Sequence, residues 1–78
     1  MNECLMNIVA GDTLYRDGSN LIDNLHCQMS ELPQVGDTVV SKHYRGKVIH
    51  RHIDYSKIQH TNPDHNGVIF VFIFCEPL

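Results

Sequence analysis

The segment Gly67–Cys75 constrains the fold more than any other part of the chain. It reads Gly-Val-Ile-Phe-Val-Phe-Ile-Phe-Cys, an aromatic and β-branched run that is typical of a strand. Side chains alternate between the two faces of a strand, so both faces of this one are apolar. Antiparallel sheets in small domains usually leave one face to water. We therefore expect a central strand that is covered on both sides.

Two arrangements would cover this strand. In the first, it lies in the middle of a closed or strongly curled barrel, with loops or a helix over its outer face. In the second, one face is an interface with another molecule. A chain of 78 residues buries only about 60% of its unfolded surface, so we favour self-association, most simply as a homodimer. The residues expected to take part are Ile69, Phe70, Val71, Phe72, Ile73 and Phe74.

Three further segments are expected to form strands. Cys4–Val9 is short, apolar and partly β-branched. Lys47–Tyr55 alternates imperfectly, and a bulge partway along would restore its alternation. Leu21–Leu32 is ambiguous, because a helix capped by Asn20 also fits its spacing. We favour a strand there, since its alternation runs directly into a turn. Its inner face would carry Leu21, Leu25, Cys27 and Met29, interrupted only by Asp23.

The segment from Leu32 to Val39 predicts a turn that leads into another strand. It reads Leu-Pro-Gln-Val-Gly-Asp-Thr-Val, in which Pro33 cannot donate to a sheet and Gly36 adopts positive φ at low cost. Asp37 is suited to accept hydrogen bonds from nearby backbone amides. A second turn is expected near Tyr44–Gly46.

Together with Tyr44 and the run Lys47-Val48-Ile49, the Leu32–Val39 segment resembles a pattern of small SH3-like barrels, which include uncharacterised bacterial, phage and mobile-element proteins. The resemblance covers about residues 25–55. It implies a small SH3-like barrel or a strongly curled antiparallel sheet, and no activity. We therefore expect residues 1–78 to form one all-β domain, or a mainly β domain with one short helix near residues 20–29.

Basic residues gather in one part of the chain. Five of the six Lys and Arg residues lie between positions 42 and 57, although the net charge is −3. A local basic surface is suited to an acidic partner. Nucleic-acid-binding domains often have a pI above about 9, and the pI here is about 6.0. A protein partner is therefore favoured, with a nucleic-acid-binding barrel as an alternative. The residues expected to bind the partner are Lys42, Tyr44, Arg45, Lys47 and Arg51.

The histidines offer a second alternative, a metal site. His50 and His52 are two residues apart, so on a strand they share one face. Zinc accepts imidazole nitrogen and carboxylate oxygen in tetrahedral geometry. We expect solvent-facing histidines and no cofactor, and keep zinc or another transition metal as the alternative. Further ligands would come from His43, His60, Asp64 and His65.

The remaining motifs argue against catalysis. The chain has no Gly-x-Ser-x-Gly, P-loop or His-Glu-x-x-His motif. Its three cysteines are widely spaced without a Cys-x-x-Cys pair, as in a reducing compartment. No apolar run approaches the roughly 20 residues that cross a bilayer. We therefore expect a cytoplasmic, non-enzymatic binding or accessory protein with no membrane partner.

Overall fold

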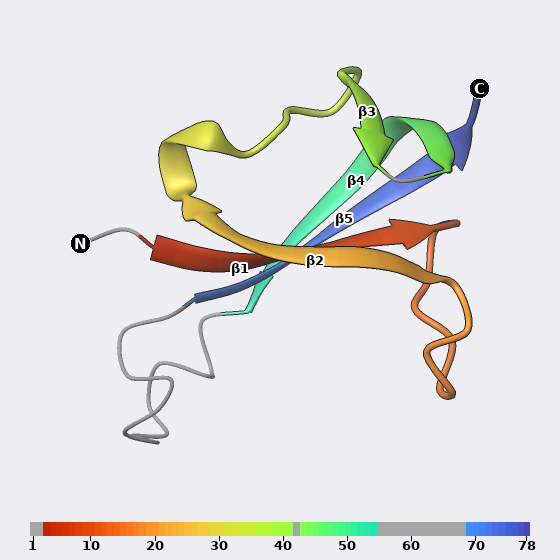
Figure 1. Cartoon of the computed structure of the whole chain (residues 1–78), viewed down its shortest axis with the longest axis horizontal. Coiled ribbons are helices and arrows are strands. Elements are labelled where there is room, and N and C mark those ends of the chain that lie inside the picture. The colour runs from red at the N-terminus through yellow and green to blue at the C-terminus, as the bar shows by residue number, and fades with distance from the viewer. Residues whose placement is uncertain (1–2, 42, 55–68) are drawn as a thin grey trace.

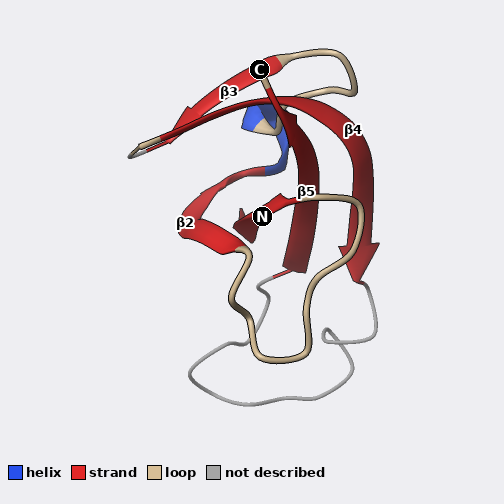
Figure 2. Cartoon of the chain, turned by 90° about the vertical axis from the view of Figure 1, so that its right-hand side faces the viewer, coloured by secondary structure: helices blue, strands red, loops and turns tan. Residues whose placement is uncertain are grey.

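The computed structural model describes residues 3–41, 43–54 and 69–78. These residues form one five-stranded sheet with the strand order β2-β1-β5-β4-β3. The sheet curls strongly into a half-barrel, and within the described residues a single 3₁₀ turn follows the end of β2 (Figures 1 and 2). The prediction of a mainly β, strongly curled fold is confirmed. The elements are β1 (Glu3–Ala10), β2 (Leu21–Gln28), η1 (Met29–Glu31), β3 (Thr38–Ser41), β4 (Tyr44–Asp54) and β5 (Ile69–Pro77).

Strand β5 lies in the middle of the sheet, between β1 and β4 (Figure 1). It pairs antiparallel with β4 and parallel with β1. The sheet is therefore mixed, with three antiparallel pairings and the parallel pairing of β1 with β5. The reason is topological. Strand β5 runs opposite to β4, the strand before it in the chain, and on its other side it pairs with β1, which runs in the same direction as β5. Residue pattern identifies strands but does not fix their order.

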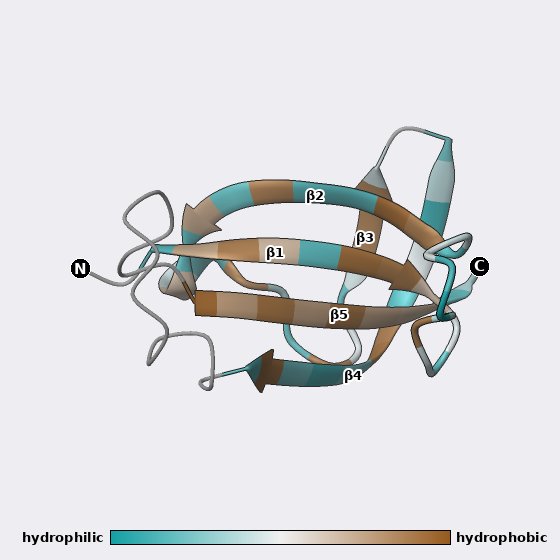
Figure 3. Cartoon of the chain, turned by 90° about the horizontal axis from the view of Figure 1, so that it is seen from below, coloured by the Kyte–Doolittle hydropathy of each residue, from teal (hydrophilic) through white to brown (hydrophobic). Residues whose placement is uncertain are grey.

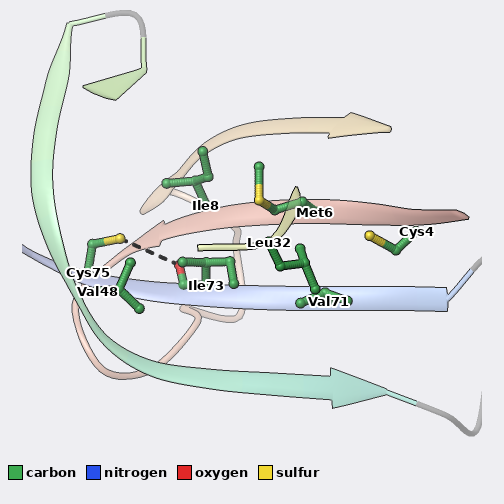
Figure 4. Packing of buried hydrophobic residues seen from close by; sticks show 8 residues of the cluster. All are labelled: Cys4, Met6, Ile8, Leu32, Val48, Val71, Ile73 and Cys75. Carbon is green, nitrogen blue, oxygen red and sulfur yellow. Dashed lines mark hydrogen bonds between the residues drawn. The ribbon is translucent and has the colours of Figure 1, made fainter. Parts of the chain in front are cut away.

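The hydrophobic core lies on the concave side of the sheet (Figure 4). Alternate residues of β1 and β5 point into it, joined by Val48 from β4 and by Leu32 from the turn after η1. Each fully buried aliphatic side chain contributes about 1.5–3 kcal/mol, so this cluster is the main stabilising feature of the half-barrel. Its members are Cys4, Met6, Ile8, Leu32, Val48, Val71, Ile73 and Cys75.

Two bulges decide which side chains reach this core. In β4 the register shifts between Val48 and His50, as the imperfect alternation of the sequence predicted. In β2 a second shift leaves Leu21 opposite Val9, while Ile22 packs against the core. Placing Leu21 on the inner face of this strand was therefore wrong. One inserted residue exchanges the inner and outer faces of the strand beyond it. No residue type in β2 indicates where that insertion occurs.

The turn between η1 and β3 has the predicted chemistry. Gly36 has a φ of +99°, and an Asp37 carboxylate oxygen accepts a hydrogen bond from the Gln34 amide at 2.8 Å. The turn then pairs with β4, because the Gly36 amide donates to the Val48 carbonyl at 2.8 Å and the Val48 amide donates to the Asp37 carbonyl at 2.9 Å. These bonds hold the segment across the half-barrel, where Leu32 enters the core.

A side-chain hydrogen bond joins the two edges of the sheet. Strands β2 and β3 are the outermost strands, and the Ser41 hydroxyl of β3 donates to a carboxylate oxygen of Asp23 in β2 at 2.8 Å. Asp23 interrupts the apolar row of β2, and this contact gives its carboxylate a partner across the open side of the half-barrel. No helix in the described part of the chain is both long and apolar enough to span a membrane.

Candidate interaction face

The outer face of the sheet carries a row of three phenylalanines. Phe70, Phe72 and Phe74 alternate along β5 with the core residues, so they point away from the concave side. Figure 3 shows this side of the sheet, with β5 hydrophobic along most of its length between β1 and β4. Phe74 is buried, whereas Phe70 and Phe72 are half-buried. The β1 residues opposite them in register are Leu5, Asn7 and Val9.

Two of the three phenylalanine rings of this face stack on each other, and each also lies beside a histidine ring of β4. The ring centroids of Phe72 and Phe74 are 6.5 Å apart with an interplanar angle of 25°. On the β4 side, His50 stacks on Phe74 at 5.5 Å and His52 lies beside Phe72 at 6.3 Å. These separations lie within the 4.5–7 Å range of favourable aromatic pairs. Phe72, Phe74, His50 and His52 therefore pack together as one group of rings on this face.

The face has an apolar centre and polar borders. Neither the phenylalanines nor their β1 neighbours carry a charge. The buried polar member of the centre is Asn7, whose amide nitrogen donates to the Val71 carbonyl at 3.2 Å and to the Leu5 carbonyl at 3.3 Å. Protein interfaces commonly combine an uncharged centre with a polar rim. The border residues are Asn24 and His26 on β2 and His50, His52 and Asp54 on β4.

The six residues expected to mediate self-association separate into two sets. Val71 and Ile73 are fully buried in the core, and Ile69 packs against it. These three side chains are occupied within the half-barrel. The other three, Phe70, Phe72 and Phe74, make up the outer row, which we call the Phe face together with Leu5, Asn7 and Val9.

The structure does not bring the expected partner-binding residues onto one surface. Arg45 and Lys47 are exposed and lie on the outer side of β4, where Lys47 is opposite Glu76. The bulge of β4 inverts the alternation after Val48, so Arg51 falls opposite the core residue Ile73. The Arg51 guanidinium donates to the side-chain carbonyl of Gln34 at 3.0 Å. Lys42 lies outside the described residues.

Tyr44 belongs to the interior rather than to a basic surface. Its ring lies over Gly46, where an added Cβ would come within 2.5 Å of a ring carbon. Within the described residues its buried hydroxyl has no hydrogen-bond partner, and burial raises the pKa of Tyr44, with smaller effects of Cys75 and Glu76. The turn predicted near Tyr44–Gly46 instead falls at His43, and β4 already begins at Tyr44.

Two exposed apolar residues, Val40 and Leu78, lie next to the exposed Arg45. Val40 of β3 is opposite Arg45, and the Leu78 amide donates to the Arg45 carbonyl at 3.2 Å. Val40 and Leu78 are 66% and 69% exposed, more than any other large apolar residue in the described ranges. We call Val40, Arg45, Lys47 and Leu78 the basic end of the sheet.

The histidines do not converge on a metal site in the described part of the chain. His50 and His52 share the outer face, as their spacing predicted, but each ring packs against a phenylalanine. Residues 3–41, 43–54 and 69–78 contain no group of three His, Cys, Asp or Glu side chains arranged to hold a metal ion. His43 is exposed in the turn before β4. The other suggested ligands, His60, Asp64 and His65, lie outside the described residues.

A pair of cysteines was missed by sequence reasoning. Cys4 and Cys27 are directly opposite in the register of β1 and β2, and their sulfur atoms are 3.5 Å apart. Both lie in segments that were expected to be strands. Pairing those two segments with each other would have indicated that their cysteines can lie opposite one another. The register that aligns them could not be predicted from the sequence, because a ten-residue loop connects the two strands. Hydrogen bonds within that loop do not follow from the residue pattern of the strands.

Comparison of the chain with protein-family models, with curated proteins and with solved structures gave no match.

Proposed function

We propose that this chain is a non-enzymatic binding protein that self-associates through the Phe face. One observation carries the proposal: all three phenylalanines of the chain point outward from its central strand, whereas the opposite side of the same strand contributes Val71, Ile73 and Cys75 to the core. Phe74 is buried within the single chain, whereas Phe70 and Phe72 are only half-buried. A second copy of the chain would give their remaining exposed surface an apolar partner.

The composition of the Phe face favours a second copy as its occupant. Apolar surface rimmed by polar side chains marks interaction sites, and closed two-fold pairing is the commonest form of self-association. In a two-fold dimer the same patch meets itself, so any charge at its centre would face a like charge. The centre of this face carries none, and its one buried polar side chain is already bonded to the sheet. Pairing therefore buries no unpaired ion.

Sedimentation equilibrium of the wild-type chain and of Phe72→Glu tests this proposal. A glutamate at the centre of the interface would be buried without a partner, so we expect the dissociation constant to rise about 30-fold or more, the effect of losing a hot-spot residue worth about 2 kcal/mol. Phe72→Ala supplies a milder version in case the charged variant unfolds, and circular dichroism verifies the β content of both.

Val35→Glu is the matched control, because Val35 is 62% exposed and lies in the turn after η1, away from the Phe face. It should leave the dissociation constant unchanged. A wild-type chain that remains monomeric at high concentration would overturn the proposal. Equal weakening by the Phe72 and Val35 variants would overturn it too.

The basic end of the sheet is the second part of the proposed binding function. Arg45 and Lys47 are exposed beside exposed Val40 and Leu78, so a partner there would meet charge and apolar surface together. We propose that this end contacts an acidic segment of a protein. The surface is small, since Tyr44 and Arg51 face the concave side, and the affinity it provides depends strongly on salt.

Fluorescence anisotropy with a labelled polyglutamate peptide at low ionic strength tests the basic end. Arg45→Glu should weaken binding severalfold, whereas Arg16→Glu, a matched change in the exposed loop after β1, should leave it nearly unchanged. Equal effects of the two variants would mean that net charge alone attracts the peptide. Tighter binding of a single-stranded oligonucleotide than of polyglutamate would favour the nucleic-acid alternative instead.

A further inference from the structure

We propose that Cys4 and Cys27 form a thiol–disulfide site, which a small-molecule disulfide such as oxidised glutathione converts into a covalent link between β1 and β2. Both cysteines are free thiols in the structure. The inference concerns a part of the molecule that the Phe face and the basic end do not use, and it is independent of the proposed binding function.

The geometry of the pair is close to that of a disulfide. Residues that oppose one another in an antiparallel ladder have Cα atoms about 4.5–5.5 Å apart, which falls within the roughly 4.4–6.8 Å range of disulfides. The sulfur atoms, at 3.5 Å, must approach by about 1.5 Å to reach bonding distance. Cys4 is held in the core, whereas Cys27 is half-buried on an edge strand. A rotation of Cys27 with a small shift of β2 closes the gap.

The two thiols differ in a way that sets the order of the reaction. Burial raises the pKa of Cys4 to about 11, with further contributions from the hydrogen bond and charge of Cys27. The thiolate is the nucleophile in disulfide exchange, so the buried Cys4 is slow to start it. Cys27, which is partly exposed, is the entry point.

The exchange then proceeds in two balanced steps. Cys27 loses its proton to water, and its thiolate attacks one sulfur of oxidised glutathione. A mixed disulfide forms, and the glutathione thiolate that is released takes up a proton from water. Cys4 next attacks the Cys27 sulfur, which lies opposite it; its proton passes to the second glutathione thiolate as that group leaves. The two protein thiols are oxidised together, and one molecule of oxidised glutathione is reduced to two molecules of glutathione.

The product would tie an edge strand to the centre of the sheet. The link encloses residues 4–27, which include most of β1, the loop after it and most of β2. A disulfide around a loop of this length restricts the unfolded chain, which typically raises the thermal midpoint of a small domain by about 10 °C or more. The chain would then be more resistant to unfolding under oxidising conditions than under reducing ones.

The third cysteine serves as an internal control. Cys75 is buried in the same core, but its sulfur lies toward the Ile73 carbonyl at 3.9 Å, and Figure 4 shows it at the opposite end of the core from Cys4. Burial also raises the pKa of Cys75. It has no thiol neighbour within the described residues, so oxidised glutathione should leave it reduced.

Peptide mapping of the wild-type chain by mass spectrometry after equilibration with excess oxidised glutathione tests the site. We expect a Cys4–Cys27 linked peptide pair, the loss of two hydrogen atoms from the intact chain, and a raised thermal midpoint that dithiothreitol reverses. Cys75→Ser should behave like the wild type, whereas Cys27→Ser should show neither the link nor the shift. A stable glutathione adduct on Cys27 without the link, or Cys27-linked dimers as the main product, would overturn the proposal.

Discussion

The loop that connects β1 to β2 should depend on one side chain, Asn20. Asn20 is buried, and its amide nitrogen donates to the carbonyls of Ala10 and Thr13, both at 2.7 Å. Its side-chain oxygen accepts a hydrogen bond from the Tyr15 amide at 2.9 Å. One side chain thus satisfies three backbone groups in and beside a ten-residue loop. Residues 11–20 form no helix or strand that would pair these groups instead.

The expected cost of removing these bonds follows from their number. A hydrogen bond in a protein contributes about 1 kcal/mol net, so Asn20→Ala should lower the free energy of unfolding by about 3 kcal/mol. In a domain of this size that corresponds to a fall of about 12–24 °C in the thermal midpoint. Asn20→Asp should be at least as destabilising at neutral pH, because it loses both donors and sets a carboxylate against two carbonyl oxygens.

The pH dependence distinguishes this mechanism from a general packing defect. Repulsion by the carbonyls raises the folded-state pKa of the introduced carboxyl above its unfolded value of about 3.9. The destabilisation of Asn20→Asp is therefore greatest where the carboxyl is ionised, and it should diminish as the pH falls through the folded-state value, since the protonated group again donates. Urea unfolding between pH 7 and pH 4, referenced to the wild type at each pH, measures this. Asn24→Asp, the same change at an exposed position of β2, should have little effect. A pH-independent cost for Asn20→Asp would refute the reasoning.

Three further outcomes follow from contacts in the structure. Gly46→Ala should destabilise the fold by about 2 kcal/mol in urea unfolding, because the added Cβ meets the Tyr44 ring; an unchanged midpoint would show that the ring moves freely. Ser41→Ala removes the bond that joins the edge strands and should cost about 1 kcal/mol, with faster hydrogen exchange in β3 as a second readout. Iodoacetamide should alkylate Cys27 first at pH 8, whereas Cys4, with its pKa near 11, should require a pH near that value; simultaneous labelling of both would contradict the burial of Cys4.

The sequence identified most strands because their residue pattern is local. The alternation of β5 placed its phenylalanines and its core residues on opposite faces, and the irregularity of β4 predicted its bulge, both as observed. The turn at Gly36 and Asp37 was also readable, since a positive φ and a side-chain acceptor are properties of single residues. Each of these features depends on a few neighbouring positions.

The features that escaped sequence reasoning depend on register and topology. The parallel pairing of β1 with β5 joins the two ends of the chain. The bulge of β2 moved Leu21 to the outer face, and the bulge of β4 separated Arg51 from Arg45. The opposition of Cys4 and Cys27 also follows from register, which the loop after β1 sets. Among the described basic residues of this segment, alternation and one inserted residue place Arg45 and Lys47 on the outer face and Arg51 on the concave face.

The proposed role of the Phe face has a direct measurement in isotope-filtered NMR of a mixed sample, with one half of the chains labelled with ¹³C and ¹⁵N and the other half unlabelled. Nuclear Overhauser effects between labelled and unlabelled copies report only contacts across an interface. We expect such effects at the rings of Phe70 and Phe72, which keep exposed surface in the single chain. Intermolecular effects confined to Val40 and Leu78, or none at concentrations well above micromolar, would contradict the account.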